Sequence, residues 1–282
     1  MPELTPAITL AVLGAALLHA SWNAMLKGGR DKMLDMAIVV AGSAVVVAPA
    51  LPFLPLPAPQ SWPYIAASMV IHVGYYTALV GTYRAGDLSH GYPLMRGVAP
   101  LLVAVFGAAV LGELPGAWMW LGILLISGGV IGIAFVGGSS LLHNWRATAW
   151  ALTNAALIAA YTLVDGTGAR LSGSSLSYVA WLLFLDGFPY VLIIAWLRRA
   201  DVVPHLRRNW LRGLAGGGLS VAAYAIVLWA MTRAPIAAVA ALRETSVIFA
   251  ALLGSWLLKE PFGRARAAGT AAVLCGVLAL RG

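Results

Sequence analysis

The stretch RGVAPLLVAVFGAAVLGELPGAWMWLGILLISGGVIGI (residues 96–133) aligns with RETSVIFAALLGSWLLKEPFGRARAAGTAAVLCGVLAL (residues 243–280) at an offset of 147 residues. Nine of the 38 aligned positions are identical. Arg96 falls on Arg243, and Glu113 falls on Glu260. Because charged residues make up only 10% of the chain, these coincidences indicate an internal repeat rather than a shared apolar composition.

The composition of the whole chain indicates a membrane protein. Of its 282 residues 61% are hydrophobic, and the mean hydropathy is +0.88. Too few charged side chains remain to cover a soluble domain, which excludes a cytosolic enzyme, a secreted disulfide scaffold and a disordered tail. The single Cys275 allows no intrachain disulfide. The basic residues behind the net charge of +8 lie mostly in short loops, so we expect no nucleic-acid binding.

Ten apolar runs are long enough for membrane-spanning helices, which need roughly 20 residues each. They cover residues 6–27, 34–52, 61–83, 91–111, 116–137, 147–170, 177–197, 212–232, 235–258 and 264–280. Five helices per half is an odd number, so the second half enters the membrane from the opposite side. The expected fold is therefore an all-α polytopic membrane protein with two inverted five-helix repeats, residues 1–140 and 141–282.

The basic residues also predict the orientation. The loops after the odd-numbered helices hold 13 of the 18 Lys and Arg residues, and the other side holds three. The positive-inside rule therefore places both termini outside the cytoplasm. The longest polar connection, from Arg198 to Arg212, is expected to be a solvated loop at a membrane face.

Polar side chains inside apolar spans are costly, so they are functional candidates by default. In the first helix a histidine, a tryptophan and an asparagine follow i, i+3, i+4 spacing, and a histidine and two tyrosines do so in the third, which places each trio on one helical face. The expected substrate-binding residues are His19, Trp22, Asn23, His72, Tyr76, Arg96, Tyr161, Asp165, Tyr224, Arg243 and Glu244.

The two repeat-equivalent arginines are the expected anchors of a central cavity. A guanidinium group holds a carboxylate or phosphate with two parallel hydrogen bonds, so Arg96 and Arg243 are expected to bind an anionic group. Pro93 and Pro100 free backbone carbonyls near Arg96, which is tolerated where a cavity satisfies them. We expect the first, third, fourth, sixth, eighth and ninth helices to line this cavity. Proton carriage is expected from Asp165, Glu244, His19 and His72.

Each of these residues also has a structural interpretation. The histidines can be hydrogen-bonded packing residues, and the adjacent arginine and glutamate of the ninth helix can satisfy one another. Asp165 can pair with Arg170, and Asp186 can hold a helix contact. Glu113 and Glu260 stand at matching helix ends, where organising a turn is the better interpretation.

The sequence lacks the common catalytic motifs. There is no Gly-Lys-Ser or Gly-Lys-Thr of a phosphate-binding loop, no His-Glu-x-x-His and no Gly-x-Ser-x-Gly. We therefore expect no enzyme activity, no catalytic residues, no cofactor and no metal site. Gly122 and Gly129, with Gly269 and Gly276, recur every seven residues and predict close helix packing, and Gly128 with Gly132 predicts a second seam.

Several stretches resemble the EamA-like family of the drug/metabolite transporter superfamily. These are the endings Leu111-Gly112-Glu113 and Leu258-Lys259-Glu260, the run His19 to Ala24, and the run Gly86 to Gly97. The resemblance implies ten helices, alternating access and outward movement of small metabolites, often amino acids, across the bacterial inner (plasma) membrane. It also implies cytoplasmic termini, which the count of basic residues contradicts.

The leading hypothesis is a secondary active transporter, most simply an exporter, of a small anionic or zwitterionic metabolite, with proton coupling as an option. One alternative is an exporter of cationic or aromatic drugs. Another is a lipid-carrier flippase or a membrane scaffold. The expected partners are a small-molecule substrate, the lipid bilayer and protons, and both a monomer and a homodimer stay open.

Overall fold

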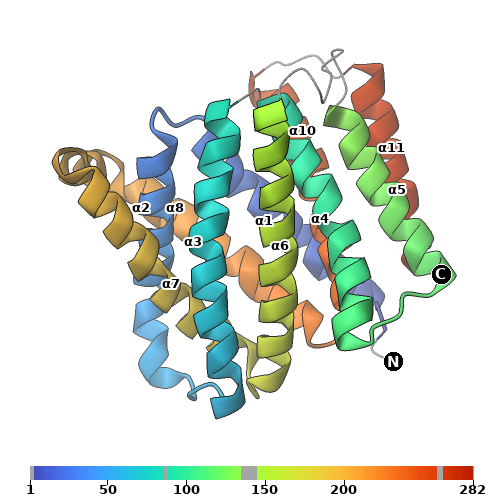
Figure 1. The fold of residues 1–282 in the computed structure, drawn as a ribbon, viewed down its shortest axis with the longest axis horizontal. Coiled ribbons are helices and arrows are strands. Elements are labelled where there is room, and N and C mark those ends of the chain that lie inside the picture. Colours follow the sequence, from blue (N-terminus) through green and yellow to red (C-terminus); the bar gives the residue numbers. More distant parts are fainter. Residues whose placement is uncertain (1–2, 86–87, 135–144, 259–262, 282) are drawn as a thin grey trace.

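The computed structural model describes residues 3–85, 88–134, 145–258 and 263–281, and every regular element within them is a helix. The elements are α1 (Pro6–Lys27), α2 (Lys32–Val47), η1 (Ala48–Phe53), η2 (Pro59–Ser61), α3 (Trp62–Ala85), α4 (Leu88–Leu111), α5 (Ala117–Ala134), α6 (Trp145–Leu171), α7 (Ser175–Leu197), α8 (Arg199–Met231), α9 (Ile236–Arg243), α10 (Ser246–Leu258) and α11 (Arg264–Ala279). Figure 1 shows them as one bundle, with both chain ends toward its lower edge.

Each of the ten expected apolar runs is helical over most of its described residues. Among the residues that the structure describes, seven helical segments are long and apolar enough to cross a membrane, and they contain most of α1, α2, α3, α4, α6, α7 and α8. The helices Ala117–Ile133 and Arg266–Ala279 are apolar but shorter. The chain is thus a multi-pass, all-helical membrane protein.

The expected single helix over residues 235–258 is wrong, because the chain breaks between α9 and α10. The amide of Glu244 donates to Ala241 and that of Thr245 to Leu242, which tightens the backbone into a turn. The Thr245 hydroxyl also donates to the Leu242 carbonyl. Side-chain hydrogen bonds of this kind compete with the helical ladder, so the run stops and restarts at Ser246.

The expected loop between Arg198 and Arg212 is also wrong, because this segment forms the start of the 33-residue helix α8. Its side chains are mostly exposed, as expected of a solvated segment. Arg198 pairs with Asp201 one turn later, and the Asn209 amide donates to the His205 carbonyl, so local contacts support this first part of the helix.

Glycines allow two pairs of helices to approach closely. A Cβ on Gly122 would lie 2.9 Å from the Gly276 carbonyl oxygen, and a Cβ on Gly129 would lie 2.7 Å from that of Gly269. This confirms the predicted seam, which joins α5 to α11 at the right of Figure 1. The second predicted seam makes no close contact within the chain, since a Cβ at Gly128 or Gly132 would meet no described atom within 4 Å. On the other side of the bundle, glycines of α2 and α8 face one another in the same way.

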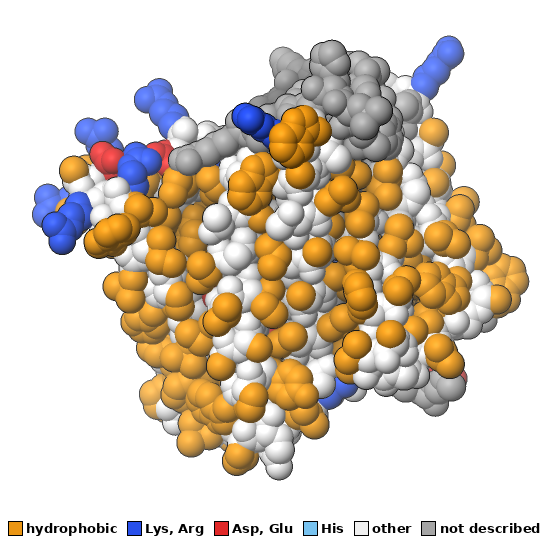
Figure 2. Space-filling model, viewed as in Figure 1, with side chains coloured by type: hydrophobic (Ala, Val, Ile, Leu, Met, Phe, Trp, Pro, Cys, Tyr) orange, Lys and Arg blue, Asp and Glu red, His pale blue; other side chains and the backbone are white. Residues whose placement is uncertain are grey.

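The surface of the bundle separates apolar and basic regions. Figure 2 shows hydrophobic side chains over the flank and most of the visible Lys and Arg side chains along the upper edge. The upper edge, called the basic end below, is the end opposite the two termini in Figure 1. An apolar flank with basic side chains gathered at one end is the surface expected of a bundle inside a bilayer.

Candidate functional site

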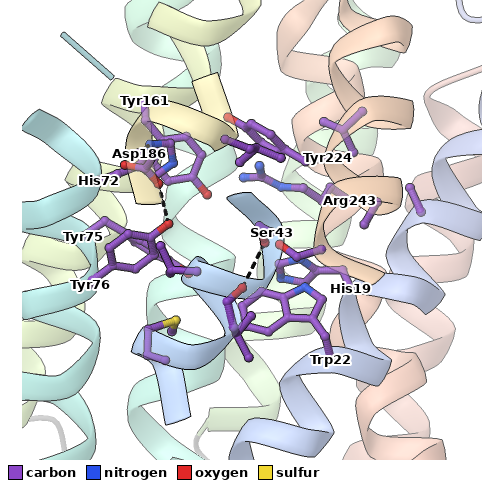
Figure 3. Close-up of a pocket in the computed structure, with 18 residues that line it drawn as sticks. His19, Trp22, Ser43, His72, Tyr75, Tyr76, Tyr161, Asp186, Tyr224 and Arg243 are labelled. Carbon is purple, nitrogen blue, oxygen red and sulfur yellow. Dashed lines mark hydrogen bonds and ion pairs between the residues drawn. The ribbon is translucent and has the colours of Figure 1, made fainter. Parts of the chain in front are cut away.

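A cavity of about 70 Å³ lies inside the bundle. Because roughly 10–15 Å³ of such space holds one water molecule, it has room for several waters or a small solute. Its walls come from α1, α2, α3, α6, α7, α8 and α9. The lining residues labelled in Figure 3 are His19, Trp22, Ser43, His72, Tyr75, Tyr76, Tyr161, Asp186, Tyr224 and Arg243.

The structure brings most of the predicted binding residues to this cavity. Those that line it are His19, Trp22, His72, Tyr76, Tyr161, Tyr224 and Arg243. Those outside its lining are Asn23, Arg96, Asp165 and Glu244. No described residue of α4 is among the lining residues, whereas α2 and α7, which were not expected to line the cavity, both contribute.

Stacked aromatic rings form one wall of the cavity. The His72 ring stacks on Tyr161 at a centroid distance of 4.6 Å and on Tyr76 at 5.8 Å. Tyr75 and Tyr224 meet these rings edge-on or tilted. Such a wall offers flat apolar surface and, at the ring edges, polar groups that can bind a solute.

Asp186 of α7 places a carboxylate in the cavity wall. It accepts a hydrogen bond of 2.7 Å from the Tyr76 hydroxyl of α3, and its other oxygen lies 3.9 Å from His72 Nδ1. The same His72 nitrogen lies 3.1 Å from the Ser68 hydroxyl. Asp186 therefore holds α7 against α3, in agreement with the structural role that the sequence suggested, and it also faces the cavity.

Arg243, at the end of α9, supplies a cation to the cavity. In Figure 3 its guanidinium group points toward the aromatic wall. It lies over the Tyr161 ring at 5.7 Å and donates to the Thr162 hydroxyl at 3.3 Å. Its Nε is 3.6 Å from a Glu244 oxygen, which bears out the expectation that these neighbours interact.

Arg96 lies behind this wall. Its Nε is 2.6 Å from the Glu244 carboxylate, and a terminal nitrogen donates to the Ser246 hydroxyl at 3.2 Å. Both charged side chains are almost completely buried. Glu244 thus bridges the two repeat-equivalent arginines, and of the pair only Arg243 lines the cavity.

Asp165 of α6 is buried next to the cavity. It accepts hydrogen bonds from the hydroxyls of Tyr178, at 3.0 Å, and Tyr224. The expected alternative pairing with Arg170 is wrong, because Arg170 pairs with Glu113. Asp165 therefore fixes Tyr224, a lining residue, from behind.

Of the three polar or aromatic residues predicted on one face of α1, two line the cavity and one does not. His19 and Trp22 meet edge-to-face at 5.1 Å, and both line the cavity. The Asn23 side chain instead donates to the His19 carbonyl at 2.8 Å within its own helix. Asn23 therefore supports the backbone of α1 rather than the cavity surface.

Several lining residues escaped the sequence analysis. On α2 these are Met36, Val39, Val40 and Ser43. An apolar side chain in an apolar run carries no mark that distinguishes a cavity wall from a lipid-facing surface. Ser43 is the polar member of this set, but its hydroxyl donates to the Val39 carbonyl of its own helix.

Both ends of the bundle are held by polar contacts between the two halves of the chain. At the end that carries the termini, Glu113 pairs with Arg170 and accepts from the Ile236 amide at 3.0 Å. Glu113 therefore holds the end of α6 and the start of α9, and its expected role in its own turn stays a prediction. Glu260 lies outside the described residues. At the basic end, Asp31 pairs with Arg198 at 2.9 Å, and Asp35 lies 3.0 Å from His205.

Asp31 also caps α2. Its carboxylate accepts from the amides of Met33 at 3.1 Å and Leu34 at 3.2 Å. Burial of the carboxylate acts to raise its pKa, but the Leu34 amide and the Arg198 guanidinium outweigh this and lower the pKa of Asp31. The ionised form is therefore the one that the folded protein stabilises.

Within the described ranges, no group of three or more His, Cys, Asp or Glu side chains could hold a metal ion. The arrangement of the cavity instead suits binding of a small polar solute. It combines one cation, one carboxylate and stacked rings in a buried chamber, which are features of a solute-binding site inside a multi-pass membrane protein.

The comparisons with known proteins agree with this class. Residues 145–282 match the model of the EamA-like transporter family. This half of the chain belongs to that family, part of the drug/metabolite transporter superfamily, and the assignment indicates a membrane transporter of that type. The resemblance expected from the sequence is thereby confirmed.

A solved crystal structure has the same fold. It superposes with a TM-score of 0.78 over 99% of this chain and 98% of its own, at 17% sequence identity. No curated protein gives a significant match to the sequence.

Proposed function

We propose that the protein is a secondary active transporter that exports a small zwitterionic or anionic metabolite by alternating access. The observation that carries this proposal is a buried cavity with Arg243 and Asp186 in its wall among aromatic side chains. Charges inside a membrane span are costly, and a transported polar solute gives them a use.

The charges favour a zwitterion over a simple anion. Glu244 lies between Arg96 and Arg243, so the ionised trio keeps one net positive charge. A carboxylate of the solute is a suitable partner for the side of Arg243 that faces the cavity. Asp186 is a suitable partner for an ammonium group. A solute with both charges satisfies both walls, whereas a simple anion leaves Asp186 without a cation.

The buried charges also support proton coupling. Three carboxylates and two guanidinium groups are buried in this region, so with neutral histidines the set has one negative charge too many. A proton on a histidine or a carboxylate balances the charge, so the site has a place for a coupling proton. The groups are Asp165, Asp186, Glu244, Arg96 and Arg243.

The helix packing supports two inverted repeats, residues 1–140 and 141–282. α3 packs on α6 as α8 packs on α1, and α4 packs on α6 as α9 and α10 pack on α1. The glycine contacts follow the same rule. At the offset of 147 residues Gly122 aligns with Gly269 and Gly129 with Gly276, and each glycine contacts the partner of the other: Gly122 lies against Gly276 and Gly129 against Gly269. Reciprocal contacts are expected of halves related by a two-fold axis.

Alternating access requires that each end open while the other stays closed. The Glu113–Arg170 pair and the Asp31–Arg198 pair both join the first half of the chain to the second, at opposite ends. Rocking of the halves would break one pair and keep the other. We place the protein in the bacterial inner membrane, with the basic end in the cytoplasm because of its excess of Lys and Arg.

Two other functions make different demands on the site. An exporter of cationic or aromatic drugs would use the tyrosine wall and Asp186, and Arg243 would then be structural. A lipid-carrier flippase or a scaffold would not need a solute in the central cavity. The wall contains both a cation and a carboxylate, and this favours the transporter of a zwitterion.

The experiment is binding and flux with chemically matched probes. Purified protein is tested with an amino acid, its N-acetyl derivative and its amide, first for thermal stabilisation and then for flux in proteoliposomes. Specific binding raises the unfolding temperature, so the zwitterion should stabilise most. Arg243→Gln should remove the preference over the amide, and Asp186→Asn the preference over the N-acetyl derivative. Flux of aromatic cations that is unchanged in Arg243→Gln, without flux of any zwitterion, would overturn the proposal.

A further inference from the structure

A second hollow lies on the flank of the bundle. It is a groove of about 760 Å³ between α2, α3, α6 and α7, with lining residues that include Val80, Arg146, Trp150, Tyr190, Ile193 and Leu197. None of its lining residues is shared with the central cavity. Since α3 and α7 end at the basic end of the bundle, where α6 begins, the groove runs from that end into the apolar flank.

The inner wall of the groove suits a hydrocarbon chain. Val80, Ile193 and Leu197 are apolar, and the two residues from α7 are 41% and 53% exposed. Exposed apolar side chains on the flank of a membrane-spanning bundle face lipid. A concave surface of this kind covers more of an acyl chain than a flat helix face does.

The mouth of the groove suits an anionic headgroup. Arg146 is exposed, and among the ion pairs of the described residues none involves it. Its guanidinium lies 5.8 Å from the Trp145 ring, and Trp150 is a groove residue one turn further on. Tryptophan is typical of the membrane interface, and a basic pocket between helices at the basic end is typical of sites for acidic lipid headgroups.

The floor of the groove touches the wall of the cavity. The Tyr190 ring, which lines the groove, lies 4.8 Å from Tyr76, whose hydroxyl donates to Asp186 in the cavity. The Trp150 ring packs directly on Gly81 of α3, because a Cβ at Gly81 would lie 2.7 Å from the indole ring. An occupant of the groove would therefore press on the same layer of side chains that shapes the cavity.

We propose that this groove binds one anionic phospholipid, with its phosphate on Arg146 and an acyl chain along α3 and α7. Charge complementarity at the mouth and the apolar wall behind it select this occupant. The proposal does not depend on the transported solute.

The test is lipid retention by the purified full chain in neutral detergent. Phosphatidylglycerol, phosphatidylcholine and inorganic phosphate are added separately, and bound lipid is counted by native mass spectrometry together with the unfolding temperature. We expect retention and stabilisation with phosphatidylglycerol only. Arg146→Gln should weaken this binding about fivefold, the size of one basic contact near a membrane surface. The matched control Arg207→Gln removes an exposed arginine of the same end outside the groove and should bind as the wild type does.

A second variant separates the groove from the charge. Ile193→Trp fills the groove without changing any charge, and it should also lose phosphatidylglycerol while keeping the unfolding temperature of the lipid-free protein. Equal retention of both lipids, unchanged binding in Arg146→Gln, or the same stabilisation by inorganic phosphate would overturn the proposal.

Discussion

The Arg96 guanidinium lies 2.6 Å from the Glu244 carboxylate, so that an ion pair joins α4 in the first half of the chain to the break between α9 and α10 in the second. Both side chains are no more than 2% exposed. Glu244 also lies 3.6 Å from Arg243. One carboxylate therefore pairs with both guanidinium groups, those of the aligned residues Arg96 and Arg243, directly beside the cavity.

This geometry predicts that Glu244 matters more for stability than Arg96. Glu244→Gln leaves two buried guanidinium groups without a carboxylate, and we expect it to lower the free energy of unfolding by about 3–5 kcal/mol. Arg96→Met should cost less, because Glu244 still has Arg243 as a partner. Chemical unfolding in detergent micelles measures both variants. Glu113→Gln, which breaks a partly exposed pair, is the control and should cost least. An equal or larger loss in Arg96→Met would show that Glu244 does not serve both arginines.

The Tyr76 hydroxyl is expected to fix the Asp186 carboxylate in the cavity wall. Tyr76→Phe removes the 2.7 Å hydrogen bond, and we expect a loss of about 1.5–3 kcal/mol in unfolding free energy, as for a bond to a charged group. Binding of a zwitterionic solute should weaken as well. Tyr75→Phe is the matched control, since its ring is equally buried and no hydrogen bond of the described residues uses its hydroxyl. If both variants lose the same stability and affinity, Asp186 does not depend on Tyr76.

The sequence was sufficient for the helical fold and for most of the residues that meet at the candidate site, because apolar length and buried charge are local properties. The ten apolar runs became helices, and His72 and Arg243 reached one cavity. The break after Arg243 was not predicted, because the apolar run continues on both sides of it, and the competing hydrogen bond from the Thr245 hydroxyl to Leu242 leaves no mark in the sequence. The wall formed by α2 was not predictable either, because Val39 and Val40 look like lipid-facing residues until the bundle is assembled.

The partners of the buried acids were equally hidden. Asp186 has its hydrogen-bond donor 110 residues away, in Tyr76, and only the packing of α3 on α7 brings the two together. Asp165 was expected near Arg170 because the two are close in sequence, yet α7 and α8 supply its tyrosines. Short-range spacing identifies which groups are costly to bury, whereas the choice of partner depends on the tertiary packing.

The contact between α5 and α11 should tolerate no side chain at its glycines. A Cβ on Gly129 would lie 2.7 Å from the Gly269 carbonyl, so Gly129→Val must push the helices apart, and we expect a loss of about 1–3 kcal/mol or more in unfolding free energy. Gly128→Val is the matched control, because it adds the same side chain to the same helix where no described atom lies within 4 Å. Thermal unfolding of both variants is the measurement. Equal stabilities would mean that the close approach of α5 and α11 does not hold the halves together.

The charge on Asp31 should stabilise the folded protein only above acidic pH. Hydrogen bonds from the Leu34 amide and from Arg198 lower the pKa of this carboxyl below its unfolded value of about 3.9, against the opposing effect of burial. A lowered folded pKa contributes stability that is present above the unfolded pKa and is lost as the pH falls through the folded one.

Asp31→Asn keeps a good helix cap but removes the charge, so it isolates this contribution. We expect the variant to unfold at a lower temperature than the wild type at pH 7, and this difference to shrink as the pH falls below the unfolded pKa of about 3.9. Asp201→Asn, which removes an exposed partner of the same arginine, should change the unfolding temperature less. A difference between Asp31→Asn and the wild type that stays constant from pH 7 to pH 3 would show that the carboxylate acts through its shape as a cap and not through its charge.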